Sequence, residues 1–279
     1  MKIGINVLLW TRQPSTEHIP LVHRIKEYGY DGVEFNVNAI KSKDASALAD
    51  TIKELDLDVT TIMTLPTPVE AGDPTSADKQ MRSKAVDWIK RRAETAKQLG
   101  ASVVGGPITE CLNIEKTTEP SEDEIKSVVE TLHDAAEFAQ TIGIKLACEI
   151  INRYEAKMAN TVDQMLNIVN LSDMPNVGLH VDTYHSNIEE LDVNAAWKKA
   201  GDRVFLVHIS ENDRGIPGAG HAAPPSIFET LREISYSDMA VIEAFFMTPG
   251  DTRKNVWRKY ARDEEEIALN GLAYIRKYW

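Results

Sequence analysis

An eight-stranded (β/α)8 barrel, of the α/β class, is the fold that the sequence predicts. Short apolar segments alternate with longer helical patterns along the whole chain, and the pair repeats eight times within 279 residues. Such alternation is typical of a parallel sheet covered by helices, and eight units in roughly 250 residues is what a closed barrel requires. A doubly wound open sheet is the alternative. The early segments "GINVLLW" and "GGPITE" do not match its glycine-rich phosphate turn.

The predicted strands are short apolar runs, and the predicted helices carry apolar residues at helical spacing or are rich in good helix formers. The strands cover residues 2–9, 31–35, 58–63, 101–106, 145–149, 176–182, 204–210 and 239–245. The helices cover residues 19–28, 44–55, 77–99, 121–142, a segment that starts at 161, 193–200, 225–234 and 264–278. Ser121 with Glu124, and Thr161 with Gln164, are capping-box patterns that mark two of the helix starts. No linker rich in Pro, Gly or Ser interrupts the pattern, so we expect one barrel domain over residues 1–279.

Composition excludes several classes of protein. The chain is 43% hydrophobic and 27% charged, which is typical of a soluble globular protein. The net charge of −12 argues against a nucleic-acid partner, since phosphate binding favours a basic surface. There are two cysteines, and Cys148 lies inside an apolar strand, so a disulfide framework is not expected. The N-terminal "MKIGINVLLW" lacks a signal-peptide core, and no apolar run is long enough to span a bilayer. We therefore expect a cytoplasmic protein with no membrane partner.

Four polar residues stand at the ends of the last four predicted strands: Glu149, Asp182, His208 and Glu243. The carboxyl ends of barrel strands meet at one face, so three carboxylates and an imidazole would gather there. A single polar residue at a strand end is usually only the first residue of a loop, but four at consecutive ends are harder to dismiss. Without a cation the carboxylates would repel each other. Their mixed oxygen and nitrogen donors suit Mn²⁺, Co²⁺ or Mg²⁺, and do not exclude Zn²⁺.

Such a centre suggests chemistry beside a sugar carbonyl. A divalent ion chelated by a hydroxyl and a carbonyl oxygen stabilises a cis-enediolate, and removal of the proton needs a positioned base. Glu149 and Glu243 stand on the fifth and eighth predicted strands, so they can approach one carbon from opposite sides. One carboxylate then removes a proton from one face and the other returns a proton to the opposite face, which inverts that carbon.

The sequence resembles the ketose 3-epimerases, the group of D-tagatose, D-allulose (psicose) and L-ribulose 3-epimerases among the xylose-isomerase-like TIM barrels. The matching segments are "EIINRYE" at 149–155, "HVDTYHSNIEE" at 180–190, "HISENDRGIPGAGH" at 208–221 and "IEAFF" at 242–246. The resemblance covers essentially the whole chain, and its specific motifs lie in the second half.

The resemblance implies roles for individual residues and for partners. The metal ligands of the family fall on Glu149, Asp182, His208 and Glu243, and its acid/base pair falls on Glu149 and Glu243. Its sugar-binding residues fall on Glu155, His185 and Arg214. One Mn²⁺ or Co²⁺ ion, a small free ketose as substrate and a homodimer or homotetramer are also implied. Glu155, His185 and Arg214 have simpler readings as a loop charge, a helix cap and a surface ion-pair partner.

Further positions near the predicted strand ends complete the expected surroundings of the site. Trp10 follows the first strand, and we expect it either to form an apolar wall against the sugar or simply to pack. His180 shares the strand face of Asp182, and we expect it to be a core histidine with its hydrogen bonds satisfied. Many members of the family carry an aromatic residue after the fourth strand, whereas this chain has "GGPITECLN" there and Met63 on the third strand. These positions are expected to face the distal carbons, so ketoses of four, five and six carbons all remain candidates.

Other functions share parts of this pattern. An aldose–ketose or hydroxypyruvate-type isomerase would use the same metal but move the proton between carbons 1 and 2. A DNA-repair endonuclease of the related barrel would need histidines on the early strands, where "TIMTL" and "VVGGP" offer none. A non-catalytic sugar-binding protein would have no use for two opposed carboxylates. The sequence therefore predicts a metal-dependent ketose 3-epimerase, with the isomerase as the alternative.

Overall fold

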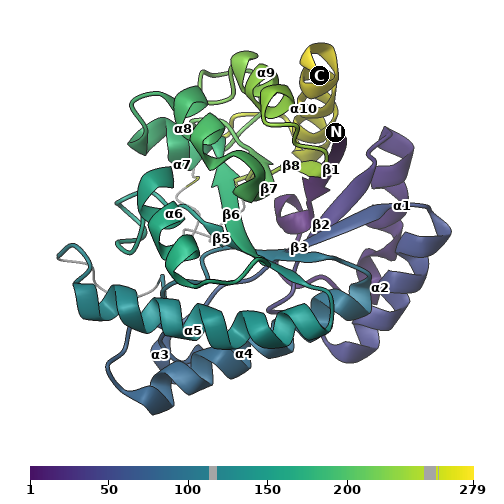
Figure 1. Ribbon diagram of the computed structural model, residues 1–279. Helices are drawn as coiled ribbons and strands as arrows, with labels where there is room; N and C mark the ends of the chain where they lie inside the picture. The colour runs from purple at the N-terminus through teal and green to yellow at the C-terminus, as the bar shows by residue number, and fades with distance from the viewer. Residues whose placement is uncertain (113–117, 248–255, 257) are drawn as a thin grey trace.

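The computed structural model describes residues 1–112, 118–247, 256 and 258–279, and these form a closed parallel barrel surrounded by helices (Figure 1). Each strand pairs with the next in sequence, and β8 pairs with β1 to close the barrel. The strands are β1 Lys2–Asn6, β2 Gly32–Asn36, β3 Asp58–Ile62, β4 Val103–Gly105, β5 Lys145–Glu149, β6 Val177–Asp182, β7 Val204–Ile209 and β8 Met239–Ile242. The predicted (β/α)8 barrel is confirmed.

Helices follow the strands in alternation and cover the outside of the barrel (Figure 1). They are α1 Ile19–Tyr28, α2 Ser42–Glu54, α3 Pro68–Ala71, α4 Lys79–Leu99, α5 Glu122–Thr141, α6 Val162–Leu171, α7 Thr183–Glu189, α8 Val193–Ala200, α9 Ser226–Glu233 and α10 Glu264–Tyr278. Short 3-10 turns are η1 Val7–Leu9, η2 Thr16–His18 and η3 Gly201–Arg203. Within the described residues, no helix is both long and apolar enough to cross a membrane.

Side-chain caps fix several helix starts where the sequence predicts them. The Ser121 hydroxyl accepts a hydrogen bond from the backbone N–H of Glu124, whose carboxylate accepts the N–H of Ser121 in return. Thr161 and Gln164 repeat this reciprocal arrangement at α6. Both predicted capping boxes are confirmed, and each satisfies backbone donors that a helix start leaves without partners.

The first strand is shorter than predicted. Residues 2–9 were expected to be extended, but the chain leaves the sheet after Asn6. The Asn6 side chain accepts a hydrogen bond from the N–H of Leu8 at 2.9 Å and so caps a 3-10 turn. This turn changes the direction in which the side chains after Asn6 point, including that of Trp10, which ends the turn.

Two short helices in the loops after strands were not predicted. Thr67 caps α3 by accepting from Glu70 N at 3.2 Å, with Pro68 in the first turn. Asp182 caps α7 by accepting from Tyr184 N at 2.6 Å. Asp182 is thus both the last residue of a strand and the cap of the next helix, which fixes its carboxylate at the end of the barrel.

Apolar side chains fill the lower part of the barrel interior. They form a separate cluster made of Ile62, Val103, Ala147, Leu206, Met239 and Val241. The larger core lies between the barrel and its helices and includes Ile5, Val33, Leu146 and Val181. Polar side chains replace the apolar ones at the carboxyl ends of the strands, so this end is where the barrel holds its chemically reactive groups.

Candidate metal centre and sugar site

The four strand-end residues meet at the carboxyl end of the barrel. Glu149 and Asp182 are the last residues of β5 and β6, His208 is the second-to-last residue of β7, and Glu243 directly follows β8. All four are buried, and one potential ligand atom from each lies within 4.8 Å of the others. This grouping forms a cluster of carboxylate and imidazole donors that can hold a divalent metal ion.

One nitrogen of His208 points at this cluster without a hydrogen-bond partner among the described residues. This nitrogen, Nδ1, is buried. It lies 3.6 Å from Glu243 Oε2 and 3.9 Å from Asp182 Oδ2. A buried nitrogen without a partner is costly, and a bound cation would give this nitrogen a partner between the two carboxylates. The residues present therefore fit a divalent metal ion.

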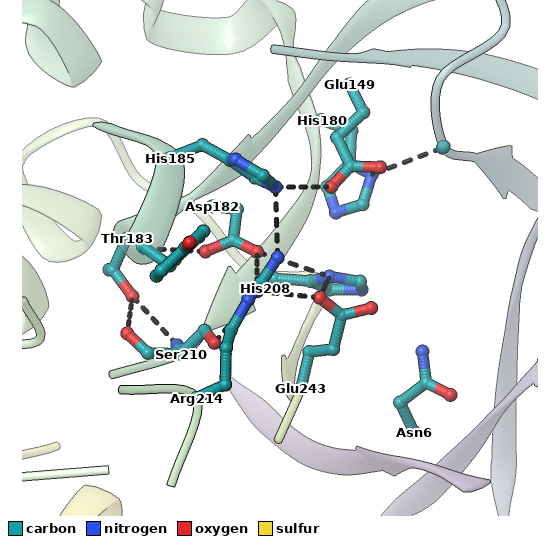
Figure 2. Close-up of polar contacts among 12 residues, drawn as sticks. Asn6, Glu149, His180, Asp182, Thr183, His185, His208, Ser210, Arg214 and Glu243 are labelled. Atoms are coloured by element: carbon teal, nitrogen blue, oxygen red, sulfur yellow. Dashed lines mark hydrogen bonds and ion pairs between the residues drawn. The ribbon is translucent and has the colours of Figure 1, made fainter. Parts of the chain in front are cut away.

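Arg214 reaches into this cluster from the loop after β7 (Figure 2). Its Nη1 donates to Asp182 Oδ2 at 3.0 Å and to Glu243 Oε2 at 2.9 Å. Its guanidinium carbon lies 3.9 Å from the centroid of the Tyr184 ring, which packs against the cationic plane. The simple reading of Arg214 as a surface ion-pair partner of Glu211 or Asp213 is wrong, because Arg214 is buried and pairs with two of the strand-end carboxylates.

The loop that carries Arg214 is held in a defined shape. Arg214 has a left-handed backbone with φ of 63°, and its N–H donates to Glu211 O. The buried Glu211 carboxylate accepts backbone N–H groups from Gly218 at 2.9 Å and Ala222 at 3.0 Å. The Glu211 side chain thus joins the start of this loop to its end, and this positions Arg214 over the open end of the barrel.

Electrostatics push the two glutamates in opposite directions. Burial raises the pKa of Glu149 well above its usual range, and the charge of Glu243 adds to this effect. Burial alone would raise the pKa of Glu243 as well, but the charges of His208 and Arg214 lower it below its usual range. Two carboxyl groups with opposite tendencies on one cavity are typical of acid/base pairs.

His185 is a neutral, buried imidazole beside this pair. Both ring nitrogens face donors: the backbone N–H of Asn152 lies 3.2 Å from Nδ1, and Arg214 Nη2 lies 3.1 Å from Nε2. Nε2 lies 3.7 Å from Glu149 Oε1 (Figure 2). Burial, and then the Arg214 charge, lower the pKa of His185 well below its ordinary value. The Asn152 amide also donates to Glu155 Oε1 at 2.8 Å, which links two of the predicted sugar-binding residues.

A cavity of about 440 Å³ opens over these groups. Its walls include five predicted site residues, Glu149, Glu155, His185, Arg214 and Glu243. The opposite wall comes from the first half of the barrel, where the sequence offered no specific motif. It includes Leu8, Arg12, Gln13, Asn36, Ile62 and Thr64.

Two predicted wall residues lie elsewhere. Trp10 is partly buried against the main hydrophobic core and is not among the described residues that line the cavity, where Leu8 stands instead. The prediction for Met63 is wrong, since Met63 is fully buried in the core outside the barrel. Its neighbours Ile62 and Thr64 face the cavity, as expected when successive side chains point to opposite sides of a strand.

Comparisons with known proteins agree with this geometry. The model of the xylose isomerase-like TIM barrel family matches residues 22–278. The ketose 3-epimerase of Arthrobacter globiformis is 30% identical over 283 residues, covering 99% of this chain and 96% of the relative. The chain belongs to the xylose isomerase-like TIM barrel family.

Within that family, the relatives fall in the predicted group. The L-ribulose 3-epimerase of Mesorhizobium japonicum is 29% identical over 279 residues, covering 98% of this chain and 93% of the relative. The crystal structure of D-allulose 3-epimerase from Methylomonas sp. in complex with D-allulose superposes with a TM-score of 0.91 at 28% identity, covering 100% of this chain and 97% of that one. The predicted resemblance to the ketose 3-epimerases, which are isomerases, is confirmed.

His180 lies behind Glu149 in this epimerase-like barrel. Its Nδ1 accepts the N–H of Gly106 at 3.2 Å, whereas its Nε2 is buried without a hydrogen-bond partner in the described part of the chain. The expectation of a core histidine with both nitrogens satisfied is therefore only half right. Burial lowers the pKa of His180 well below its ordinary value, so the ring is neutral.

Gly106 supports both His180 and Glu149, and we expect Gly106→Ala to destabilise the barrel. Its carbonyl accepts the N–H of Glu149 at 3.0 Å, its φ is 108°, and an added Cβ would lie 2.1 Å from the backbone oxygen of Met63. Strain and overlap together should lower the free energy of unfolding by about 2–6 kcal/mol, as measured by urea denaturation.

The matched control for Gly106 is Gly201→Ala. Gly201 also has a positive φ, of 56°, but an added Cβ would meet nothing within 4 Å. It therefore tests the backbone conformation alone, and we expect a loss of only about 1–2 kcal/mol. Equal losses in the two variants would show that the overlap with Met63 is relieved in solution.

Metal affinity should fall as the pH is lowered. Burial would lower the pKa of His208, but the carboxylates of Glu34 and Glu243 raise it well above its ordinary value, and the pKa of Glu149 is raised too. A metal ion must displace the protons that these groups hold, so the dissociation constant for Mn²⁺ should rise about tenfold per pH unit for each proton displaced. Calorimetric titrations between pH 6 and pH 8 measure this, and a dissociation constant that does not change would contradict it.

Glu34 is the buried site residue that the sequence analysis missed. It lies in the middle of β2, is 0% exposed, and its Oε1 is 2.7 Å from His208 Nε2. The signal was an acidic residue inside the apolar strand "GVEFN", which also reads as an ordinary polar position on a half-exposed strand. The strand-end rule that found the other carboxylates does not apply to a residue in the middle of a strand.

Proposed function

We propose that this protein is a metal-dependent 3-epimerase of a free ketose. The observation that carries the proposal is the meeting of Glu149 and Glu243, from β5 and β8, at one cavity beside a cluster of metal-ligand type. Relatives named as L-ribulose 3-epimerase, ketose 3-epimerase and D-psicose 3-epimerase support a small ketose as the substrate.

The proposed metal ligands are Glu149, Asp182, His208 and Glu243, with Mn²⁺ or Co²⁺ as the preferred ion and Mg²⁺ as a further candidate. When bound, the cation supplies polarisation of the carbonyl at C2 and of the neighbouring hydroxyl, which makes the proton on C3 more acidic. Oxygen and nitrogen donors in this ratio are consistent with those ions.

The two glutamates move the proton. With one epimer, a carboxylate oxygen of one glutamate takes the proton from C3, and the electron pair of the C–H bond is delocalised towards the oxygen on C2. The carboxyl group of the other glutamate then gives its proton to the opposite face of C3. In the reverse reaction Glu149 and Glu243 exchange roles, so one site can convert either epimer into the other.

The remaining predicted residues orient the sugar. Arg214 offers a cationic donor beside Glu243, and the neutral His185 ring lies beside Glu149. Both can hold substrate oxygens close to the reacting carbon. At the cavity wall, the Glu155 carboxylate accepts a hydrogen bond from a sugar hydroxyl. Trp10 remains a predicted contact, although its present packing against the core does not support a direct one.

Exchange in D₂O tests this function. The protein is incubated with Mn²⁺ and, separately, with D-fructose, D-tagatose, L-ribulose and D-erythrulose, and proton NMR follows C3. Loss of the C3 proton signal together with the C3 epimer supports the proposal and ranks the sugars. Exchange at C1 or C2 with formation of an aldose would instead identify the aldose–ketose or hydroxypyruvate-type isomerase. Incubation with chelator in place of Mn²⁺ is the control.

The homodimeric or homotetrameric assembly and the cytoplasmic location remain predictions. Size-exclusion chromatography with light scattering separates a monomer of 31.1 kDa from either oligomer. A monomer at micromolar concentration would contradict the assembly.

A further inference from the structure

Glu34 is a carboxylate held inside the barrel by side chains from three other strands. Its Oε1 accepts the Asn6 amide at 2.8 Å and lies 2.7 Å from His208 Nε2, and its Oε2 accepts the Thr60 hydroxyl at 2.9 Å. The pairing register places Asn6 beside Glu34 and Glu34 beside Thr60 on β1, β2 and β3. Burying a carboxylate is costly unless it is paired and hydrogen-bonded, and this one is satisfied at both oxygens.

The direction of these hydrogen bonds determines which nitrogen of His208 carries a proton. Asn6 Oδ1 accepts the N–H of Leu8, so the amide nitrogen of Asn6 is the end that faces Glu34. Oε1 of Glu34 is therefore an acceptor, and His208 Nε2–H donates to it. The lone pair of the neutral ring is then on Nδ1, the atom that faces Asp182 and Glu243.

We infer that Glu34 is a positioning residue for the metal centre. It fixes the tautomer and the orientation of His208, so that Nδ1 is presented to a cation together with the three strand-end carboxylates. This inference rests on the metal site of the proposed function. It also gives the first three strands a part in a centre whose ligands all come from the last four, through Asn6 and Thr60.

A carboxylate behind a metal-bound histidine does two separable things. As an acceptor it holds the ring in place, and as a charge it makes the imidazole a stronger ligand; loss of such a partner typically costs 10–100-fold in metal affinity. Glu34→Gln removes the charge but keeps an oxygen that can accept from His208, while the Thr60 hydroxyl can turn to accept from the new amide. Glu34→Ala removes both effects.

Calorimetric titration of the metal-free proteins with Mn²⁺ tests the inference without relying on activity. We expect the dissociation constant to rise about 10–100-fold in Glu34→Ala and by a smaller factor in Glu34→Gln. The thermal midpoint of each metal-free protein is measured alongside. If Glu34→Ala does not fold, the Glu34→Gln titration still decides, because its geometry is preserved.

The matched control is Thr61→Val on the neighbouring strand. Thr61 is fully buried and donates to Val103 O at 2.8 Å, so this variant loses a buried hydrogen bond in the same sheet but not next to His208. Its Mn²⁺ affinity should equal that of the wild type. Wild-type affinity in both Glu34 variants, or an equal loss in Thr61→Val, would overturn the positioning role. Absence of Mn²⁺ binding by the wild-type protein would instead refute the metal site of the proposed function, and with it this inference.

Discussion

Glu243→Gln should lower the rate of C3 epimerisation by at least about 10³-fold, because the variant loses a proton carrier and an anionic ligand together. The substitution keeps the size of the side chain, and Arg214 Nη1 can donate to the remaining amide oxygen, so the fold should stay intact. Formation of the C3 epimer is measured by NMR under saturating Mn²⁺, with circular dichroism as the check on folding. Full activity in this variant would overturn the acid/base assignment.

Loss of the base can be separated from loss of the metal by following each epimer in D₂O. If Glu243 serves one face of C3, Glu243→Gln should still exchange the C3 proton of one epimer through Glu149, without converting it. Glu149→Gln should show the opposite preference. Loss of exchange with both epimers in both variants, despite normal Mn²⁺ content, would mean that the two glutamates do not act on separate faces.

The positions of the metal-ligand candidates could be predicted because barrel topology alone brings strand ends together. Glu149, Asp182, His208 and Glu243 each needed only a correctly placed strand, and the apolar runs of β5 to β8 were clear enough to place them. Their convergence did not depend on any side-chain conformation. The same reasoning explains why the closed barrel itself was predictable from alternation.

The detailed contacts of the site depend on loop and side-chain geometry that a pattern does not contain. Arg214 reaches Asp182 because its backbone is left-handed and Glu211 fastens the turn, and neither feature has a periodic signature. For Trp10 the sequence left two alternatives open, a wall against the sugar or simple packing, and the cap at Asn6 that ends β1 early has no periodic signature that could decide between them. Glu34 was missed because its importance arises across the barrel, from His208, which is 174 residues away in sequence.

Removal of the metal should lower the thermal midpoint by about 5–10 °C as well as abolish turnover. A ligand present at 100 times its dissociation constant stabilises the folded state by about 2.7 kcal/mol, and a chain of this size gains about 2–4 °C per kcal/mol. The physical reason is that the cation offsets repulsion between Glu149, Asp182 and Glu243, which lie within 4.8 Å of one another together with His208. Differential scanning calorimetry after dialysis against chelator, and again after Mn²⁺ or Co²⁺ is restored, measures the effect.

Asp182→Asn is the variant that assigns this stabilisation to the proposed centre. An asparagine oxygen can still accept the N–H of Tyr184 and cap α7, so the start of that helix is retained, while an anionic ligand and the acceptor of Arg214 Nη1 are lost. The shift produced by Mn²⁺ should shrink in this variant, whereas a monovalent salt at equal ionic strength should affect wild type and variant alike. An undiminished shift in Asp182→Asn would mean that the stabilising ion binds elsewhere, even if chelator abolishes activity. The two measurements together therefore separate a metal that is held by the strand ends from one that only stabilises the surface.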